Sequence, residues 1–346
     1  MKLEIKRIIP NMLVHWASSG ELLATSNYSI YTSKDEGETF RRVTELRVHF
    51  LSQAASRFKF FSRVFRLGIR DVRKLKSNTL LAIADRKLFR IANGESQVTY
   101  SFKHGFGPLR EGWCEDNEGN LYLSEYFQNS RRTIRVKLLK STDDGLTWKT
   151  VSFFKGVRHI HCVQFDPFSK SIWLGTGDRN EESSILVSKD KGTTWTKIGF
   201  GNQSYRTISF IFTEKYVYWG SDIPTRQNYI YRYDRENCRI QKISPVNGPV
   251  FYSNILENRI MLFATTVEGN SEGKSIPWDN RATIWASQNG TCWKSLINYE
   301  KDRYPFLLGF GMLIFAHKQH GNNVYFTAQA LRKADNMLFH GTIRIP

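Results

Sequence analysis

Long apolar runs, paired cysteines and a leader-like start are all missing from this sequence, and each absence narrows what the chain can be. No run of about 18 apolar residues occurs, so no helix is expected to span a membrane. Cysteines are few and far apart, with no C-x-x-C motif, which favours free thiols. The opening M-K-L-E-I-K-R-I-I-P lacks the apolar core and cleavage site of a signal peptide. We therefore expect a cytoplasmic protein, with a peripheral position at the inner membrane face as the alternative.

Acidic residues are also scarce relative to basic ones. The 346 residues include 50 Lys and Arg against 32 Asp and Glu, which gives a net charge of +18. Such a balance favours anionic partners. No nucleic-acid-binding motif is found, so we expect no nucleic acid and instead an acidic oligo- or polysaccharide. A basic, well-solvated surface without a dedicated partner is the alternative, and the oligomeric state is not set by the sequence.

One short motif occurs repeatedly along the chain. Residues 141–148 read S-T-D-D-G-L-T-W and residues 188–195 read S-K-D-K-G-T-T-W. Looser copies at 33–40 and 287–293 give a period of about 50 residues, the mark of a repeat architecture. Each copy lies between alternating or apolar runs, which predicts a strand, a turn and a strand. The Asp can accept turn N–H bonds and the Gly supplies a positive φ, so the motif is structural, and the ligand series of a calcium loop is absent.

These residues resemble the Asp-box (BNR) repeat of the sialidase-like β-propellers. The two full copies, Ser141–Trp148 and Ser188–Trp195, carry the resemblance, and the two looser copies extend it over nearly the whole chain. The resemblance implies an all-β propeller, a fold that serves both glycan enzymes and binding proteins.

Read as blades of four antiparallel strands, the chain forms one domain over 1–346. We expect seven blades, with six as the alternative. Six blades are predicted at 12–50, 68–103, 108–155, 158–200, 204–245 and 249–299. The tail 307–346 offers only three strands, so the opening K-L-E-I-K-R-I-I is expected to supply the fourth and close the ring, which removes exposed sheet edges.

A basic insertion at 47–67 interrupts this pattern. Apolar residues recur there at helical spacing, namely Leu51, Ala54, Ala55, Phe58, Phe61 and Phe65, and no Asp or Glu occurs among them. A basic helix with a phenylalanine-rich face can lie on an anionic membrane surface. The alternative is a helix that covers the propeller's edge with its phenylalanines facing inward.

Acidic residues follow the second strand of five predicted blades. They are Asp85, Glu125, Asp178, Asp222 and Glu268. The first strands begin with further polar residues, namely Arg110, Glu111, Arg158, His159, His161, Tyr205 and Arg206. Strand alternation places His159 and His161 on one face. Because these ends of the strands lie opposite the Asp-box turns, we expect these side chains to gather in a polar cup.

Such a cup favours an enzyme that acts on an acidic glycan. Two carboxylates in unlike environments can serve as acid and base or nucleophile in glycoside hydrolysis, and the first choice is Glu125 with Asp178. The other predicted catalytic residues are Glu111, Glu268, Tyr126, His159 and His161. Substrate contacts are predicted for Arg110, Arg158, Arg179, Tyr205, Arg206, Asp85, Asp222 and Trp219. For each single acid, a turn cap or an ion pair is the structural alternative.

Other chemistries fit the same residue types. A polysaccharide lyase would use Tyr or His with Arg to remove the proton beside a uronate carboxylate. A membrane-associated glycosyltransferase and a non-catalytic glycan- or protein-binding propeller are further alternatives. The resemblance to sialidases implies an arginine triad, for which Arg110, Arg158 and Arg206 are candidates, and a tyrosine nucleophile at Tyr126 or Tyr205. The sialidase Arg-Ile-Pro motif is matched only loosely by K-R-I-I-P at 6–10.

Metal binding is the remaining alternative for the histidines. Two histidines at i and i+2 on a strand can join a carboxylate and His104, but spacing fixes no third ligand. We therefore expect neither a metal ion nor a cofactor.

Overall fold

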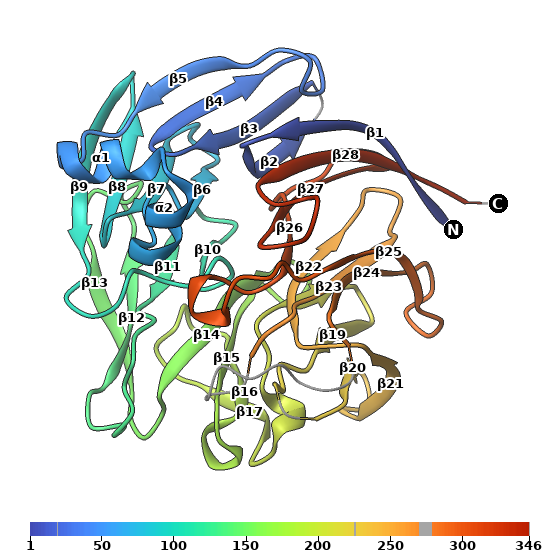
Figure 1. Cartoon of the computed structure of the whole chain (residues 1–346). Coiled ribbons are helices and arrows are strands. Elements are labelled where there is room, and N and C mark those ends of the chain that lie inside the picture. The colour runs from blue at the N-terminus through green and yellow to red at the C-terminus, as the bar shows by residue number, and fades with distance from the viewer. Residues whose placement is uncertain (19, 225, 270–278, 346) are drawn as a thin grey trace. The chain divides into compact units, whose positions relative to one another are not determined.

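The computed structural model describes residues 1–18, 20–224, 226–269 and 279–345. It contains seven four-stranded antiparallel sheets (Figure 1). In six of them the hydrogen-bonded neighbours follow one another along the chain, and in the seventh the first strand pairs with the last. The fold is therefore a seven-bladed β-propeller, which confirms the predicted number of seven blades over the alternative of six. Residues 270–278, inside the sixth predicted blade, lie outside the described residues.

The chain divides into two compact units. Unit 1 comprises residues 1–69, 223–229 and 243–346. One of its sheets contains β2 (Leu13–Ser18), β3 (Glu21–Ser26), β4 (Ser29–Ser33) and β5 (Arg41–Glu45). A second contains β22 (Val250–Ile255), β23 (Met261–Thr265), β24 (Arg281–Ser287) and β25 (Lys294–Glu300). A third contains β1 (Lys2–Pro10), β28 (Met337–Arg344), β27 (Asn323–Gln329) and β26 (Met312–Phe315), and a 3₁₀ turn, η3, spans Phe306–Leu308.

Unit 2 comprises residues 70–222 and 230–242. Its first sheet contains β6 (Asp71–Lys74), β7 (Leu80–Ala84), β8 (Lys87–Ala92) and β9 (Glu95–Ser101). The next contains β10 (Trp113–Glu115), β11 (Leu121–Ser124), β12 (Val136–Ser141) and β13 (Lys149–Phe154). The third contains β14 (His159–Asp166), β15 (Ser171–Gly177), β16 (Ser184–Ser188) and β17 (Thr196–Phe200), with 3₁₀ turns η1 (Asn180–Glu182) and η2 (Gln203–Tyr205) beside it. A fourth sheet, most of it in unit 2, contains β18 (Phe210–Phe212), β19 (Tyr216–Gly220), β20 (Asn228–Asp234) and β21 (Ile240–Val246).

The opening strand completes the last sheet, as predicted. β1 pairs antiparallel with β28, from Lys2 opposite Arg344 to Pro10 opposite Met337. Leu3 and Ile343 are buried in the core that this sheet shares with β22–β25 of the same unit. The chain thus joins its two ends in one sheet, which leaves no unpaired edge on β28.

The repeated motif forms the turn between the third and fourth strands of its sheet in all four copies, as predicted. In the second copy, Ser141 Oγ donates to Asp143 Oδ1 at 2.7 Å and accepts from Gly145 N at 3.0 Å. Asp143 then accepts from the backbone N–H of Thr147 at 3.0 Å and from its hydroxyl at 2.6 Å. The first and third copies repeat these bonds around Asp35 and Asp190, which shows that the motif is a hydrogen-bonded turn.

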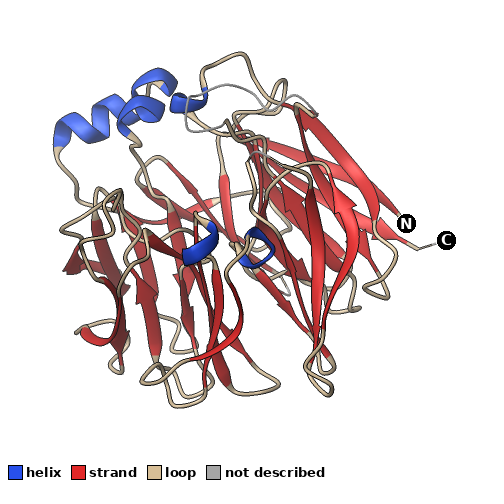
Figure 2. Ribbon diagram, turned by 90° about the horizontal axis from the view of Figure 1, so that it is seen from below, coloured by secondary structure: helices blue, strands red, loops and turns tan. Residues whose placement is uncertain are grey.

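The basic insertion forms two short helices in place of the single helix that the sequence predicts. α1 spans Phe50–Ser56 and α2 spans Lys59–Phe65, with Phe58 in an extended conformation between them (Figure 2). None of the helices in the described part of the chain is long and apolar enough to cross a membrane.

All four cysteines lie within the described residues and are free thiols. Cys162 is buried, Cys114 is half-buried, and Cys238 and Cys292 are exposed.

Candidate functional site

Polar side chains meet at one end of two neighbouring sheets of unit 2, opposite the Asp-box turns. His159 and His161 lie at the start of β14, and Asp178 directly follows β15. Arg206 follows η2 on the way to β18. The strand register shows that these groups lie opposite the Asp-box turn. His159 pairs with Gly177 at the end of β15, whereas Ser188, where the Asp-box turn begins, pairs with Ile172 near the start of β15. We call Arg158, His159, His161, Asp178 and Arg206 the histidine–arginine cluster.

Three ligand-type atoms lie at the centre of this cluster. His159 Nε2 is 2.9 Å from His161 Nε2, and both lie close to Asp178 Oδ1, at 3.4 Å and 3.2 Å respectively. The histidine side chains are almost fully buried, whereas Asp178 remains 14% exposed and Arg158 28% exposed. The histidines are thus held inside the protein, while the arginine and the carboxylate are open to a ligand.

Local backbone features bring these groups together. The pairing of β14 with β15 shifts between Ile160 and Cys162, so His161 sits in a β-bulge, which redirects its side chain. Gly177 then leaves room beside it: a Cβ at this position would lie 2.9 Å from Arg206 Cγ and 3.1 Å from His161 Cε1. A side chain at Gly177 would therefore displace one of these two residues.

Asp178 is the electrostatic centre of the cluster. Arg158 Nη1 donates to Asp178 Oδ2, and Arg206 Nη2 lies 3.2 Å from Asp178 Oδ1. Burial raises the pKa of Asp178, but hydrogen bonds from His159 and His161 and the charge of Arg206 outweigh it and hold the pKa far below its ordinary value. Asp178 therefore stays ionised and is poorly suited to act as a proton donor.

The outer nitrogens of the two histidines face acceptors. His159 Nδ1 lies 3.4 Å from the backbone oxygen of Phe127, and His161 Nδ1 lies 3.7 Å from Asp222 Oδ2. Burial lowers the pKa of His159 to about 4, which keeps its ring neutral near pH 7. Asp222 also accepts from Arg206 Nε at 3.0 Å, and burial raises its pKa against the opposing charge of Arg206.

The loop after β11 lies against the cluster. The ring of Tyr126 packs on that of His159, with centroids 4.1 Å apart. Gln128 accepts from Arg158 Nη2. Glu182 braces the other side: it accepts from the backbone N–H of Arg158 at 2.6 Å and pairs with Arg132 at 2.6 Å.

Arg110 and Glu111 belong to a separate buried cluster of unit 2. Arg110 Nη1 donates to Asp71 Oδ1 at 2.9 Å, and Trp113 Nε1 donates to Asp71 Oδ2 at 2.7 Å. Glu111 is reached by Gln164 at 3.3 Å, and burial raises its pKa. Arg110 therefore pairs with Asp71 in this second cluster.

The remaining predicted residues have partners or positions of their own. Glu125 accepts from Tyr100 Oη at 2.8 Å. Trp219 is fully buried, stacks on Tyr231 and donates to the backbone oxygen of Ser204 at 2.8 Å, which suits a core residue. Three others lie in turns. Asp85 is in the turn after β7 with φ 46°, Tyr205 is the last residue of η2, and Arg179 precedes η1 with its side chain 63% exposed. Glu268 follows β23 in unit 1.

Sequence reasoning missed several supporting residues. Asp71 opens β6, the same place in its sheet as His159 in β14, so a search of every first strand would have found it. Glu182, Arg132 and Gln128 lie in connections between strands, where no periodic pattern marks them.

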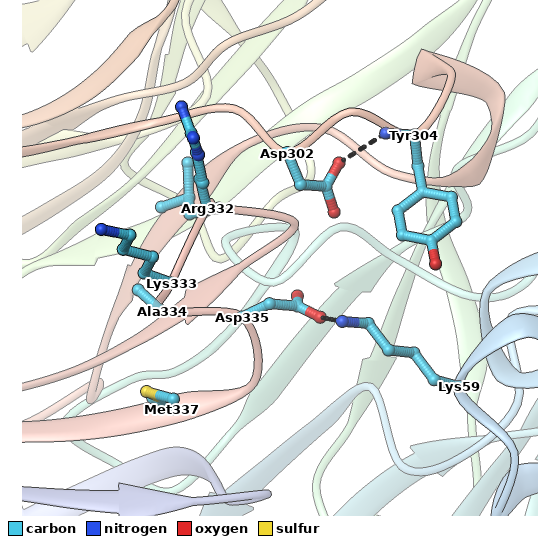
Figure 3. Close-up of a pocket in the computed structure, with 9 residues that line it drawn as sticks. Lys59, Asp302, Tyr304, Arg332, Lys333, Ala334, Asp335 and Met337 are labelled. Atoms are coloured by element: carbon cyan, nitrogen blue, oxygen red, sulfur yellow. Dashed lines mark hydrogen bonds and ion pairs between the residues drawn. The ribbon is translucent and has the colours of Figure 1, made fainter.

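A pocket lies in unit 1 beneath the helical insertion. Figure 3 shows Asp335 paired with Lys59 of α2, with Asp302 and Tyr304 on the facing loop. Arg63 of α2, between the same two acids, is 2.7 Å from Asp302 and 2.9 Å from Asp335. These contacts hold α2 against the segments of unit 1 that contain Asp302 and Asp335.

No family model and no curated protein matches this chain. Solved structures match it in fold. An oligogalacturonate lyase in complex with manganese covers 99% of this chain and 97% of its own, with a TM-score of 0.63 and 10% identity. A chain of the mitotic checkpoint complex (TM-score 0.59, 8% identity, 99% and 95% covered) and YCF48 bound to D1 peptide (0.59, 10%, 99% and 96%) are similar in the same way. At these identities the similarity shows the propeller fold alone.

Proposed function

We propose that this chain is an enzyme that acts on an acidic glycan by elimination beside a uronate carboxylate. The observation that carries the proposal is the histidine–arginine cluster, in which two guanidinium groups surround a polar centre at the ends of adjacent strands. Guanidinium groups bind carboxylates through paired hydrogen bonds, and Arg158 is open to solvent on one side. The net charge of +18 would concentrate an anionic polymer near this surface.

The chemistry divides among the residues present. Arg158 and Arg206 would bind the sugar carboxylate and stabilise the negative charge that develops when the proton on the neighbouring carbon is removed. Tyr126, against His159, is the candidate proton acceptor. The electron pair of the broken C–H bond forms a carbon–carbon double bond, the glycosidic carbon–oxygen bond breaks, and the leaving oxygen takes up a proton.

The geometry favours elimination over the paired-carboxylate hydrolysis that the sequence first suggested. Hydrolysis needs one protonated carboxyl beside an ionised one. Asp178 is held ionised by its neighbours, so it does not suit the role of the protonated carboxyl in such a pair. One of the proteins with a similar fold is an oligogalacturonate lyase, which supports elimination. The Asp-box turns separately support a relationship to the sialidase-like propellers.

The test is incubation with a panel of polyuronates and uronate oligomers, followed by ultraviolet absorbance of the unsaturated product. Tyr126→Phe should lower kcat by about 100-fold or more, with little change in KM, because the phenol is lost while the arginines remain. Arg42→Gln, an exposed arginine in unit 1 whose side chain pairs with Glu45, is the matched control and should keep full activity. Reducing ends without ultraviolet absorbance would indicate hydrolysis, and binding without turnover would indicate a non-catalytic propeller; either result overturns the proposal.

A further inference from the structure

We propose that His159 Nε2, His161 Nε2 and Asp178 Oδ1 bind one divalent transition-metal ion. The inference rests on the proposed function for the role of the ion, but its binding can be measured without turnover. The three atoms are separated by 2.9, 3.2 and 3.4 Å. Ligands about 2.1 Å from one ion lie about 3.0–3.4 Å apart in octahedral or tetrahedral geometry, so the atoms already have the spacing of adjacent ligands.

The proton inventory supports this assignment. A neutral histidine carries one N–H, and an acceptor faces the outer nitrogen of each ring. His159 Nδ1 faces the backbone oxygen of Phe127, and His161 Nδ1 faces the carboxylate of Asp222. Without an ion, a proton on Nε2 can bond to Asp178 Oδ1. With both protons on Nδ1, each Nε2 instead presents a lone pair beside Asp178 Oδ1, and a cation can take the place of the proton there. Metal-bound histidines commonly have a carbonyl or carboxylate at the second nitrogen.

The outer nitrogen of His161 also supports a bound ion. His161 Nδ1 forms no hydrogen bond with any described residue, although a carboxylate oxygen of Asp222 lies 3.7 Å away. A metal ion on Nε2 would fix the proton on Nδ1 and strengthen its attraction to Asp222.

The surrounding charge predicts how the ion and the sugar influence each other. Arg158 and Arg206 balance Asp178 and Asp222, so a divalent ion adds two uncompensated positive charges to a largely buried site. A uronate carboxylate would neutralise part of that charge. Metal and acidic sugar should therefore bind cooperatively, each raising the affinity of the other.

Two imidazoles and one carboxylate are ligands that suit Mn²⁺, Fe²⁺ or Zn²⁺ better than Ca²⁺ or Mg²⁺. The test uses the full chain, stripped with a chelator, and titrates it with Mn²⁺ and Zn²⁺ by calorimetry, with the bound ion counted by elemental analysis. We expect one ion per chain, and His161→Gln and Asp178→Asn should each lower the affinity by about tenfold or more. His15→Gln is the matched control, because His15 is equally buried in a bulge of β2 but bonds to Thr25.

The outcomes separate this inference from the proposed function. Stoichiometric binding that is lost in both cluster variants, without uronate turnover, supports the metal site and overturns the function. Turnover by a chain that binds no ion, and that chelator does not inhibit, overturns the metal site and keeps the function. Binding that persists unchanged in both variants also overturns the site.

A second observation, independent of this site, concerns the helical insertion. We infer that α1 and α2 dock on an anionic phospholipid membrane. Large apolar side chains on these helices are exposed to solvent: Phe50 70%, Leu51 59%, Phe58 63%, Phe60 57%, Phe61 44%, Val64 41% and Phe65 57%. The rings of Phe58, Phe60 and Phe65 each lie within 6.4 Å of that of Phe61, so they form one contiguous patch. Apolar patches of this kind mark interaction surfaces.

The orientation of α2 is the reverse of ordinary packing. Its basic side faces the protein, where Arg63 pairs with Asp302 and Asp335 and lies over the ring of Tyr304, with 5.0 Å to the centroid. Lys59 pairs with Asp335 at the same place (Figure 3). These ion pairs keep the phenylalanine side directed away from the core. The alternative that the sequence left open, with the phenylalanines facing inward, is therefore not what the structure shows.

Charge selects the membrane as the occupant. Residues 46–70 contain six Lys or Arg and no Asp or Glu. Lys59 and Arg63 pair with acids of the protein, whereas Arg47, Arg57 and Arg66 are exposed on the same segment as the patch. Apolar side chains flanked by basic ones bind the boundary of an anionic bilayer, where burial and attraction to lipid headgroups add together.

The test is co-sedimentation of the full chain with vesicles of phosphatidylcholine alone or mixed with phosphatidylglycerol. We expect binding to the mixed vesicles, roughly tenfold weaker after Phe58→Ser or Phe65→Ser, and weaker after Arg57→Glu. Phe153→Ser is the matched control, because Phe153 is 54% exposed on β13 of unit 2, and it should bind as the parent does. Equal binding to both vesicle types, or no binding together with self-association that Phe58→Ser abolishes, would overturn the membrane assignment.

Discussion

Asp143 illustrates how one side chain organises a turn. Its carboxylate accepts two hydrogen bonds from Thr147, and these, followed by the bond from Ser141, lower its pKa to about 2. The same bonds from Thr194 and Ser188 lower the pKa of Asp190 to about 2. A carboxylate bound in this way stabilises the folded chain only while it is ionised.

The pH dependence of this contribution follows from the sign of the shift. The unfolded pKa of Asp is about 3.9, so between about pH 4 and pH 2 the unfolded state binds more protons than the folded state. The stabilisation is complete above that range and disappears as the pH falls towards 2. Thr147→Val should raise the pKa of Asp143 and cost about 1 kcal/mol at neutral pH. Carboxyl NMR titration and urea unfolding measure the two effects.

Thr150→Val provides the comparison for this experiment. Thr150 is exposed on β13, a few residues beyond the turn, so its substitution should leave the pKa of Asp143 and the stability nearly unchanged. An unchanged pKa for Asp143 in Thr147→Val would show that the hydroxyl does not hold the carboxylate.

At the scale of the element, β1 shows how the fold is closed. The strand alternates between the core of unit 1 and solvent: Leu3 is 7% exposed and packs in the core, whereas Ile8 is 52% exposed. Pairing with β28 is common to both residues, so burial is the variable that separates them.

Leu3→Ala should therefore destabilise the chain by about 2–3 kcal/mol, since it leaves a cavity between the sheets. Ile8→Ala, on the same strand, should stay within about 0.5 kcal/mol of the parent. Urea unfolding of the two variants compares them directly. Equal effects would mean that β1 contributes through its backbone pairing alone.

The elements also show which features a sequence reveals. Motif spacing and strand alternation predict the Asp-box turns, the closing strand and the strand ends that hold Asp178 and His159, because these depend on local pattern and order. The ion-pair partners of these residues could not be predicted in this way. That Arg110 pairs with Asp71, and that α2 turns its basic side inward, depends on acids distant in sequence, whose positions follow only from packed strands and loops. Patterns in a single segment contain no such information.

At the scale of the whole molecule, two contributions to anion binding can be separated: the net charge of +18 and the buried groups around Asp178. Charges on exposed side chains act over the Debye length, which shrinks from about 10 Å at 0.1 M salt to about 3 Å at 1 M. The buried groups around Asp178 are screened far less. Surface charge should therefore govern how fast an acidic polymer arrives, and the cluster how long it stays.

We expect the association rate of a polyuronate to fall about tenfold or more over that salt range, while the dissociation rate changes much less. Surface-plasmon measurements at several salt concentrations give both rates, and a neutral dextran of similar length serves as the comparison. Arg158→Gln should show the opposite pattern, with faster dissociation and nearly unchanged association, because it removes one charge of many but one of two guanidinium groups at Asp178. An association rate independent of salt would mean that the surface charge plays no part in capturing the polymer.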